Sequence, residues 1–143
     1  EGLPFEDCAL DVVNAGEIVE HLYDTKLFIQ ECRRVLKQDG ILLFTTPNLN
    51  SLENRLRVAT GGYLSMAGAY PEDHFGSHVR IFNLPKIREL CRQTGFEFQD
   101  ARGVFTLEQR ARWTWKLVDA PLRVAARVAP SLSKLLMIKA RRK

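Results

Sequence analysis

The sequence contains few of the residues and patterns that mark secreted, membrane-spanning or metal-stabilised proteins. Its three cysteines, Cys8, Cys32 and Cys91, form no C-x-x-C pair, so they predict neither a disulfide framework nor a cysteine zinc site. No stretch comes near the roughly 20 apolar residues that a membrane-spanning helix needs. The chain starts without Met and without a basic leader followed by an apolar run. We therefore expect a cytoplasmic protein and a chain that is part of a longer one.

Patterns that would indicate a specific chemistry are also scarce. The adjacent glycines Gly61 and Gly62 lack the G-x-G spacing of a phosphate-binding loop, and no strand-like run leads directly into them. The histidines form neither H-E-x-x-H nor a helical metal pair, and His74 with His78 would need help from Asp73 to bind a metal ion. There is no G-x-S-x-G motif. The sequence therefore predicts no metal site, no phosphate loop of its own and no serine hydrolase.

The composition is that of one globular domain with an uneven distribution of charge. The chain has 143 residues, of which 45% are apolar and 27% charged. Residues 1–103 carry 11 Lys/Arg and 15 Asp/Glu, whereas residues 104–143 carry 10 and 2. Such an asymmetry indicates either an anionic partner or a solvated basic face.

The first half of the chain has the pattern of a strand, a helix and a second strand. Leu10–Ala15 is a short apolar run typical of a buried parallel strand, and Gly16 breaks it. Apolar residues at helical spacing follow Asp24, and Asp39-Gly40 is expected to end that helix. Ile41–Thr46 is the second strand. This βαβ unit predicts a parallel sheet covered by helices.

The second half is less regular. Residues 48–84 read as a long aromatic-bearing loop of the kind that often covers a binding site, with a helix at Leu52–Ala59. Asn83-Leu84-Pro85 begins another helix that runs through Cys91 and ends before Gly95. Two strands complete the expected elements, Phe96–Ala101 and Leu135–Ala140.

A set of short motifs occurs in a fixed order along this framework. They are L-P-F at 3–5, D-V-V at 11–13, G-E-I-V-E-H at 16–21, R-V-L-K-Q-D-G at 34–40, T-T-P-N at 45–48 and H-V-R-I-F-N at 78–83. In order and spacing the chain resembles the second half of class I S-adenosylmethionine-dependent methyltransferases, in the subgroup acting on small molecules, lipids and sugars. One departure is Gln38-Asp39-Gly40, where the family pattern has P-G-G.

The resemblance implies an α/β fold in which the chain supplies part of a Rossmann-like methyltransferase sheet, strands four to seven, with flanking helices. Residues 1–103 would form the C-terminal half of the methyltransferase domain, with 48–84 as a substrate-lid-like insertion. Residues 104–143 would add a basic amphipathic helical segment and the final strand. The strand at 10–14 would then lie at an unpaired sheet edge, and the chain alone would be incomplete for binding S-adenosylmethionine.

The same resemblance implies where the cofactor lies. Leu3 would lie against the adenine, and Asn14, Ala15 and Gly16 would line the cofactor near its methyl group. The general rule that open α/β sheets bind ligands beyond the carboxyl ends of their strands points to the same place.

His21 is the candidate catalytic residue, because an imidazole can accept a proton from an acceptor hydroxyl while the methyl group transfers. The alternative is that Glu20-His21 only fixes the turn into the next helix. His78 and Arg80 have two interpretations as well: they contact a polar substrate, or they hold the base of the long loop.

The segment 107–129 combines Trp113, Trp115 and aliphatic residues on one helical face with basic residues on the other. It indicates peripheral contact with the inner membrane surface, or a helix that covers the sheet or a second subunit. There is no strong nucleic-acid signal. The sequence therefore predicts methyl transfer from S-adenosylmethionine to a small-molecule, sugar or lipid-linked acceptor. The alternative is a basic membrane- or nucleic-acid-binding adaptor on a degenerate methyltransferase sheet.

Overall fold

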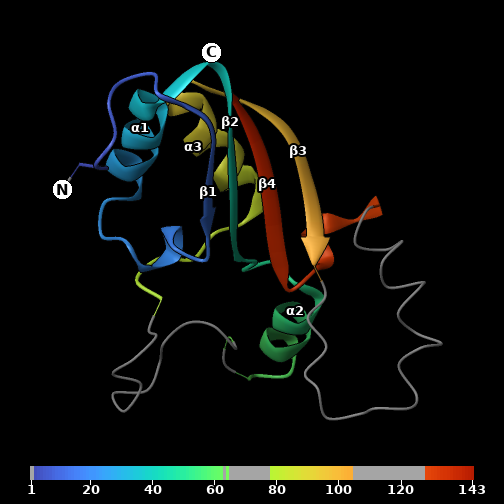
Figure 1. The fold of residues 1–143 in the computed structure, drawn as a ribbon. Coiled ribbons are helices and arrows are strands. Elements are labelled where there is room, and N and C mark those ends of the chain that lie inside the picture. Colours follow the sequence, from blue (N-terminus) through green and yellow to red (C-terminus); the bar gives the residue numbers. More distant parts are fainter. Residues whose placement is uncertain (1, 63, 65–77, 105–127) are drawn as a thin grey trace, which may run out of the picture.

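A four-stranded mixed sheet forms the centre of the fold (Figure 1). The structure, a computed structural model, describes residues 2–62, 64, 78–104 and 128–143. The strand order is β1-β2-β4-β3. β1 and β2 are parallel, and β4 is antiparallel to both β2 and β3. The strand bounds are Leu10–Gly16 for β1, Leu36–Pro47 for β2, Phe96–Val104 for β3 and Leu135–Arg142 for β4.

This architecture confirms the predicted α/β class and the partial Rossmann-like sheet. Each predicted strand is present. β3 and β4 extend beyond their predicted ends, and β2 begins at Leu36 rather than at the predicted Ile41. Within the described part of the chain β1 pairs with β2 alone and is therefore an edge strand, as predicted. The opposite edge of the sheet is β3.

The helix α1, Thr25–Val35, connects the two parallel strands. It begins at Asp24, whose Oδ1 accepts a hydrogen bond of 2.9 Å from the backbone N–H of Leu27. Its apolar face buries Ile29 and Cys32 completely. The predicted start of this helix is thus confirmed.

The predicted end of α1 at Asp39-Gly40 is wrong. The helix stops at Val35, and β2 begins at the next residue, Leu36, which pairs with Leu10 of β1. The residues up to Gly40 form an excursion in β2, and within it Asp39 rather than a glycine has the left-handed conformation, with φ of 62°. Pairing with a neighbouring strand outweighs the helical periodicity that continues through this segment.

The other helices follow their local signals. α2 covers Leu52–Ala59 as predicted, and α3 covers Leu84–Gln93 with Asn83 as its N-cap. Gly95 follows α3 with φ of 77°, and a Cβ there would lie 2.6 Å from the Arg33 side chain, so this position requires glycine. In the described part of the chain, two single-turn 3-10 helices complete the elements, η1 at Val19–His21 and η2 at Pro130–Leu132.

One face of the sheet forms the core. Alternate side chains of β2 and β4 point into it, and α1 and α3 cover that same face (Figure 1). The fully buried residues include Ile29, Leu42, Phe44, Ile87, Leu136 and Ile138. On the other face Val12 and Met137 remain 52% and 44% exposed.

Asn48, at the end of β2, joins three parts of the chain. Its side-chain N–H groups donate to the carbonyls of Ser131 and Ser133, each at 2.8 Å, and its Oδ1 accepts from the Asn50 N–H at 3.0 Å. Its backbone forms a bridge with Phe82, just before α3. The side chain is 1% exposed. The asparagine of the T-T-P-N motif is therefore a buried structural junction.

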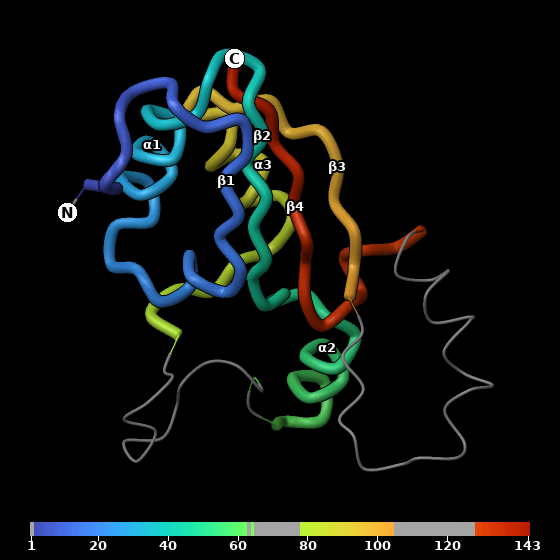
Figure 2. The backbone as a smooth tube through the Cα atoms, in the orientation of Figure 1, coloured from blue at the N-terminus to red at the C-terminus, as the bar shows by residue number. Residues whose placement is uncertain are grey.

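The C-terminus closes the opposite end of the sheet. Figure 2 shows the C-terminus at the end of the sheet where β2 begins. The Lys143 N–H bonds to the carbonyl of Gly95, in the turn between α3 and β3, at 3.2 Å, and its carbonyl accepts a hydrogen bond from Arg33 of α1. Within the described residues no helix is long and apolar enough to cross a membrane. The segment 107–129 lies outside the described residues except for its last two positions.

Candidate cofactor and acceptor site

The predicted cofactor residues at the end of β1 differ in exposure. Asn14 and Gly16 are exposed, whereas the Ala15 side chain points into the core and is 1% exposed. After Gly16 the chain turns away at Glu17, a non-glycine residue with φ of 52° whose N–H bonds to Thr45. A left-handed residue at the carboxyl end of a strand is a form of local strain that often accompanies a binding site.

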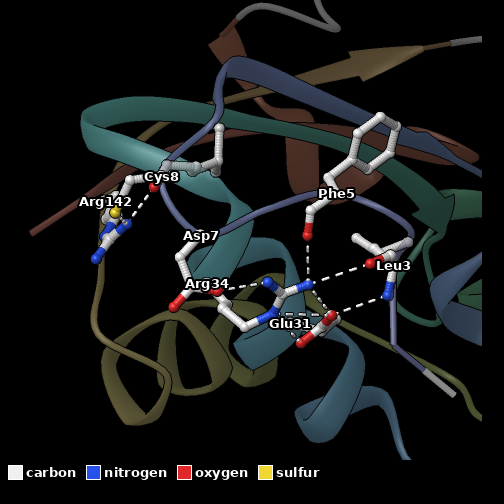
Figure 3. Close-up of polar contacts among 8 residues, drawn as sticks. Leu3, Phe5, Asp7, Cys8, Glu31, Arg34 and Arg142 are labelled. Carbon is white, nitrogen blue, oxygen red and sulfur yellow. Dashed lines mark hydrogen bonds and ion pairs between the residues drawn. The ribbon is translucent and has the colours of Figure 1, made fainter.

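The segment that contains Leu3 is fixed against α1 by one glutamate and one arginine (Figure 3). Glu31 accepts a 2.8 Å hydrogen bond from the Leu3 N–H. Arg34 donates to the carbonyls of Leu3 and Phe5 and forms an ion pair of 2.5 Å with Asp7. The Leu3 side chain is half-buried against the core. A contact from Leu3 to an adenine would therefore come from a segment that is already held in place.

The same contacts determine the electrostatics of Glu31. The hydrogen bonds from the Arg34 guanidinium, and next from the Leu3 N–H, lower the pKa of Glu31 to about 2. The carboxylate in turn raises the pKa of Arg34. This pair was not among the predicted site residues, although an acid three residues before an arginine on one helix is a usable signal.

His21 ends η1, shortly after β1, and its side chain is exposed. The structure places His78 beside it, with ring centroids 4.8 Å apart and ring planes inclined by 53°. Glu20 lies close to both histidines and is buried, with 1% of its surface exposed. Neither of its carboxylate oxygens has a hydrogen-bond partner among the described residues. One ligand-type atom from each of the three side chains lies within 4.8 Å of the other two. Glu20 and His21 are neighbours in the sequence, whereas His78 is far from them, so its approach to the other two is a product of the fold.

Arg80 holds this arrangement together. Its backbone N–H bonds to the Glu20 carbonyl at 3.0 Å, and its side chain donates to the carbonyls of Leu22 and Tyr23. Of the two interpretations of Arg80, the structure favours the one in which it holds the base of the long loop. His78, two residues earlier, is thereby brought to His21.

Two hollows lie beside this region. One of about 370 Å³ separates the N-terminal segment from the start of α1 and is lined mainly by apolar side chains, including Leu22 and Phe28. The other, of about 180 Å³, lies between the N-terminal end of α1 and one side of α3 and includes Arg80 and Lys86 in its lining. Both are next to the residues that follow η1.

Comparison with known proteins supplies the family. A family model described as a methyltransferase domain matches residues 1–44. A probable S-adenosylmethionine-dependent methyltransferase of Mycolicibacterium smegmatis is 33% identical over 138 residues, which is 94% of this chain and 48% of that protein. The chain belongs to the class I S-adenosylmethionine-dependent methyltransferases.

Other methyltransferases agree with this assignment. A mitochondrial ubiquinone biosynthesis O-methyltransferase of Bos taurus is 32% identical over 107 residues, which is 73% of this chain and 28% of that protein. A solved methyltransferase of Thermotoga maritima, described as a possible histamine N-methyltransferase, aligns with a TM-score of 0.67 at 16% identity, covering 99% of this chain and 60% of that one. The chain spans about half the length of the mycobacterial relative and less of the bovine one.

The residues present in this methyltransferase chain fit S-adenosylmethionine, the cofactor of the family, over part of its surface. At the carboxyl end of β1, Asn14 offers an exposed amide, Gly16 offers exposed backbone, and Ala15 can contribute only its backbone. Leu3 offers a half-buried apolar side chain on a fixed segment. The glycine loop that the family uses has no counterpart among the 143 residues. The individual roles of these four residues, and the prediction of no metal site, stay predictions.

Proposed function

We propose that this chain is part of an enzyme that transfers a methyl group from S-adenosylmethionine to a small-molecule, sugar or lipid-linked acceptor. The observation that supports the proposal is that β1 ends on the exposed Asn14 and Gly16 and that η1, which ends in the exposed His21, follows it in the chain. The bovine relative is named for ubiquinone biosynthesis, which supports a lipid-like acceptor.

In this proposal the protein contributes mainly alignment. When bound, S-adenosylmethionine supplies an electrophilic methyl group on a positively charged sulfur. Leu3 and the end of β1 orient the cofactor, and His21 accepts the proton that the acceptor loses. Holding two reactants in line is worth several kcal/mol of barrier, on the order of 7–11 in favourable intramolecular cases. A site that acts mainly by aligning its reactants needs few dedicated catalytic side chains.

The first test uses cofactor binding. The 143-residue chain alone should show no binding of S-adenosylmethionine in the micromolar range by calorimetry, because it lacks the glycine loop. A protein that carries the same chain behind a glycine-loop half-domain should bind it, and should transfer labelled methyl groups to a component of a lipid or small-molecule extract. Tight binding by the chain alone would contradict the proposed division of the site, and binding without any transfer would contradict the proposed activity.

The second test addresses His21 in that longer protein. His21→Ala should lower the rate of methyl transfer by roughly 10²-fold or more and leave cofactor affinity nearly unchanged. Gln99→Ala, an exposed position of β3, serves as the control and should change neither quantity. Equal losses in cofactor affinity and thermal stability in His21→Ala would show that the residue only fixes the turn.

We also propose that the segment 107–129 contacts an anionic membrane surface peripherally, which would place a lipid-linked acceptor near the site. The excess of basic residues in the last 40 positions supports this proposal.

A further inference from the structure

We propose that His21 does not act alone: Glu20, His21 and His78 form one proton-accepting cluster, and the acceptor that it serves is a hydroxyl group. The inference rests on the proposed function for its role in methyl transfer, and on geometry alone for the existence of the cluster. It adds two residues, Glu20 and His78, to the candidate catalytic apparatus.

The geometry orders the three groups by depth. His21 is exposed and is the member that a ligand can reach, His78 is half-buried, and Glu20 is buried at 1% exposure. The two rings lie 4.8 Å apart between centroids. The position of His78 is fixed by Arg80, whose backbone bonds to Glu20 and whose side chain bonds to Leu22 and Tyr23. The cluster is therefore built from two distant segments held by a specific clamp.

The buried Glu20 is the member whose presence most needs an explanation. A carboxylate without a hydrogen-bond partner is costly to bury, and none of the described residues supplies one. Burial raises the pKa of Glu20, and its own backbone N–H opposes this in part. The nearby carboxylate of Glu17 raises the pKa further, whereas positive charge on His78 or His21 lowers it. A negative charge on Glu20 is thus stabilised when a neighbouring imidazole takes up a proton.

This arrangement favours a proton that is shared by the cluster. Two adjacent imidazoles repel each other when both are protonated, so the pair takes up one proton more readily than two. The negative charge of the Glu20 carboxylate balances the positive charge of that one proton. The Arg80 guanidinium is directed to the carbonyls of Leu22 and Tyr23. His21 is the exposed member and is therefore the one that an acceptor can reach.

The chemistry points to a hydroxyl acceptor. A neutral amine already has an available electron pair, whereas a hydroxyl needs its proton removed as it attacks. The proton of the acceptor O–H moves to the imidazole of His21. The oxygen uses the freed electron pair to form the bond to the methyl carbon, while the carbon–sulfur bond breaks and the sulfur keeps its pair as a neutral thioether. The added proton leaves the cluster to water through the exposed His21.

The cluster can be tested on the 143-residue chain without any activity. Proton NMR of the imidazole C2–H signals, recorded in EDTA from pH 4.5 to 9, compares wild type with His21→Gln, His78→Gln and Glu20→Gln, with folding checked by circular dichroism. We expect removal of either histidine to raise the apparent pKa of the other, and Glu20→Gln to lower that of both, each by about 0.5 unit or more. Gln99→Ala, at an exposed position of β3, is the control and should move neither titration by more than about 0.2 unit.

Independent titration of His21 and His78, unchanged in the partner variant, would overturn the cluster. Because two of the comparisons involve only histidines, this holds even if Glu20→Gln fails to fold. Coupling that appears only after Zn²⁺ replaces EDTA would also overturn it, since a cation and not a proton would then connect the groups.

The role in catalysis is tested in the longer protein. In His78→Gln and Glu20→Gln the acidic limb of the pH profile of kcat/KM should move in the same direction as the NMR titration of His21, and the labelled product should be a methyl ether. A uniform loss of rate at every pH would indicate a structural role and overturn the inference, as would a methylamine product. Coupled titration without any methyl transfer would instead reject the proposed function and leave the cluster in place.

Discussion

Asn48 offers the sharpest test of how the end of β2 is held. Asn48→Ala removes two donated hydrogen bonds, to Ser131 and Ser133, and one accepted from Asn50. A net hydrogen bond contributes about 1 kcal/mol, and carbonyls left buried without a partner add to the cost, so we expect the free energy of unfolding to fall by about 3 kcal/mol. For a chain of this size that corresponds to a drop of about 10 °C in Tm.

Urea titration followed by circular dichroism, together with thermal unfolding, measures this loss. Asn50→Ala is the matched control, because that side chain makes none of the three bonds and its loss should cost about 0.5 kcal/mol or less. A loss below about 1 kcal/mol in Asn48→Ala would show that the junction does not hold η2 and β4 in place. A fall in the m-value as well would show that β4 had separated from the sheet.

Further outcomes follow from contacts elsewhere in the fold. The pKa of Glu31 lies near 2, below its usual value, so the ion pair that Glu31 forms stabilises the fold at neutral pH. This contribution is lost as the pH falls from about 4.5 to 2. In Glu31→Gln the free energy of unfolding should therefore depend less on pH in this window, as measured by acid unfolding. Burial raises the pKa of the Cys32 thiol to about 12 and that of Cys91 to about 11, so at pH 8 a thiol reagent should modify exposed Cys8 in the native chain and reach the other two only after unfolding. Replacing the tryptophans and arginines within 107–129 should abolish sedimentation of the longer protein with anionic liposomes at low salt. If the wild-type protein does not sediment with these liposomes, the membrane proposal is contradicted.

The elements that the sequence predicts well are those whose signals are local. α2 has its predicted bounds because Ser51 caps its first turn, and α3 ends where Gly95 can adopt the left-handed conformation. The end of α1 could not be read in the same way. Leu36 continues the helical periodicity, and only its pairing with Leu10, a contact with another strand, assigns it to β2.

In the candidate site, too, the features with local signals follow from the sequence, and those that depend on distant contacts do not. The exposed end of β1 and the position of His21 after it follow from the order of motifs in the chain. The meeting of His21 with His78 does not, because it depends on the hydrogen bonds that Arg80 makes with Leu22 and Tyr23 after a long connection. Nor could alternation in β1 decide which of its last residues face outward until the sheet showed that Ala15 points into the core.

β4 follows all the other strands in the chain but lies in the interior of the sheet, between β2 and β3. Ile41 pairs with Arg141, so the ladder that joins the two halves of the sheet closes across almost the whole chain. A polypeptide that already contains β1, β2 and β3 but not β4 has a two-stranded piece of sheet and an unpaired β3, and β4 is the strand that joins them. Loss of β4 would therefore leave open edges on β2 and β3, and such a product would be prone to aggregation and proteolysis.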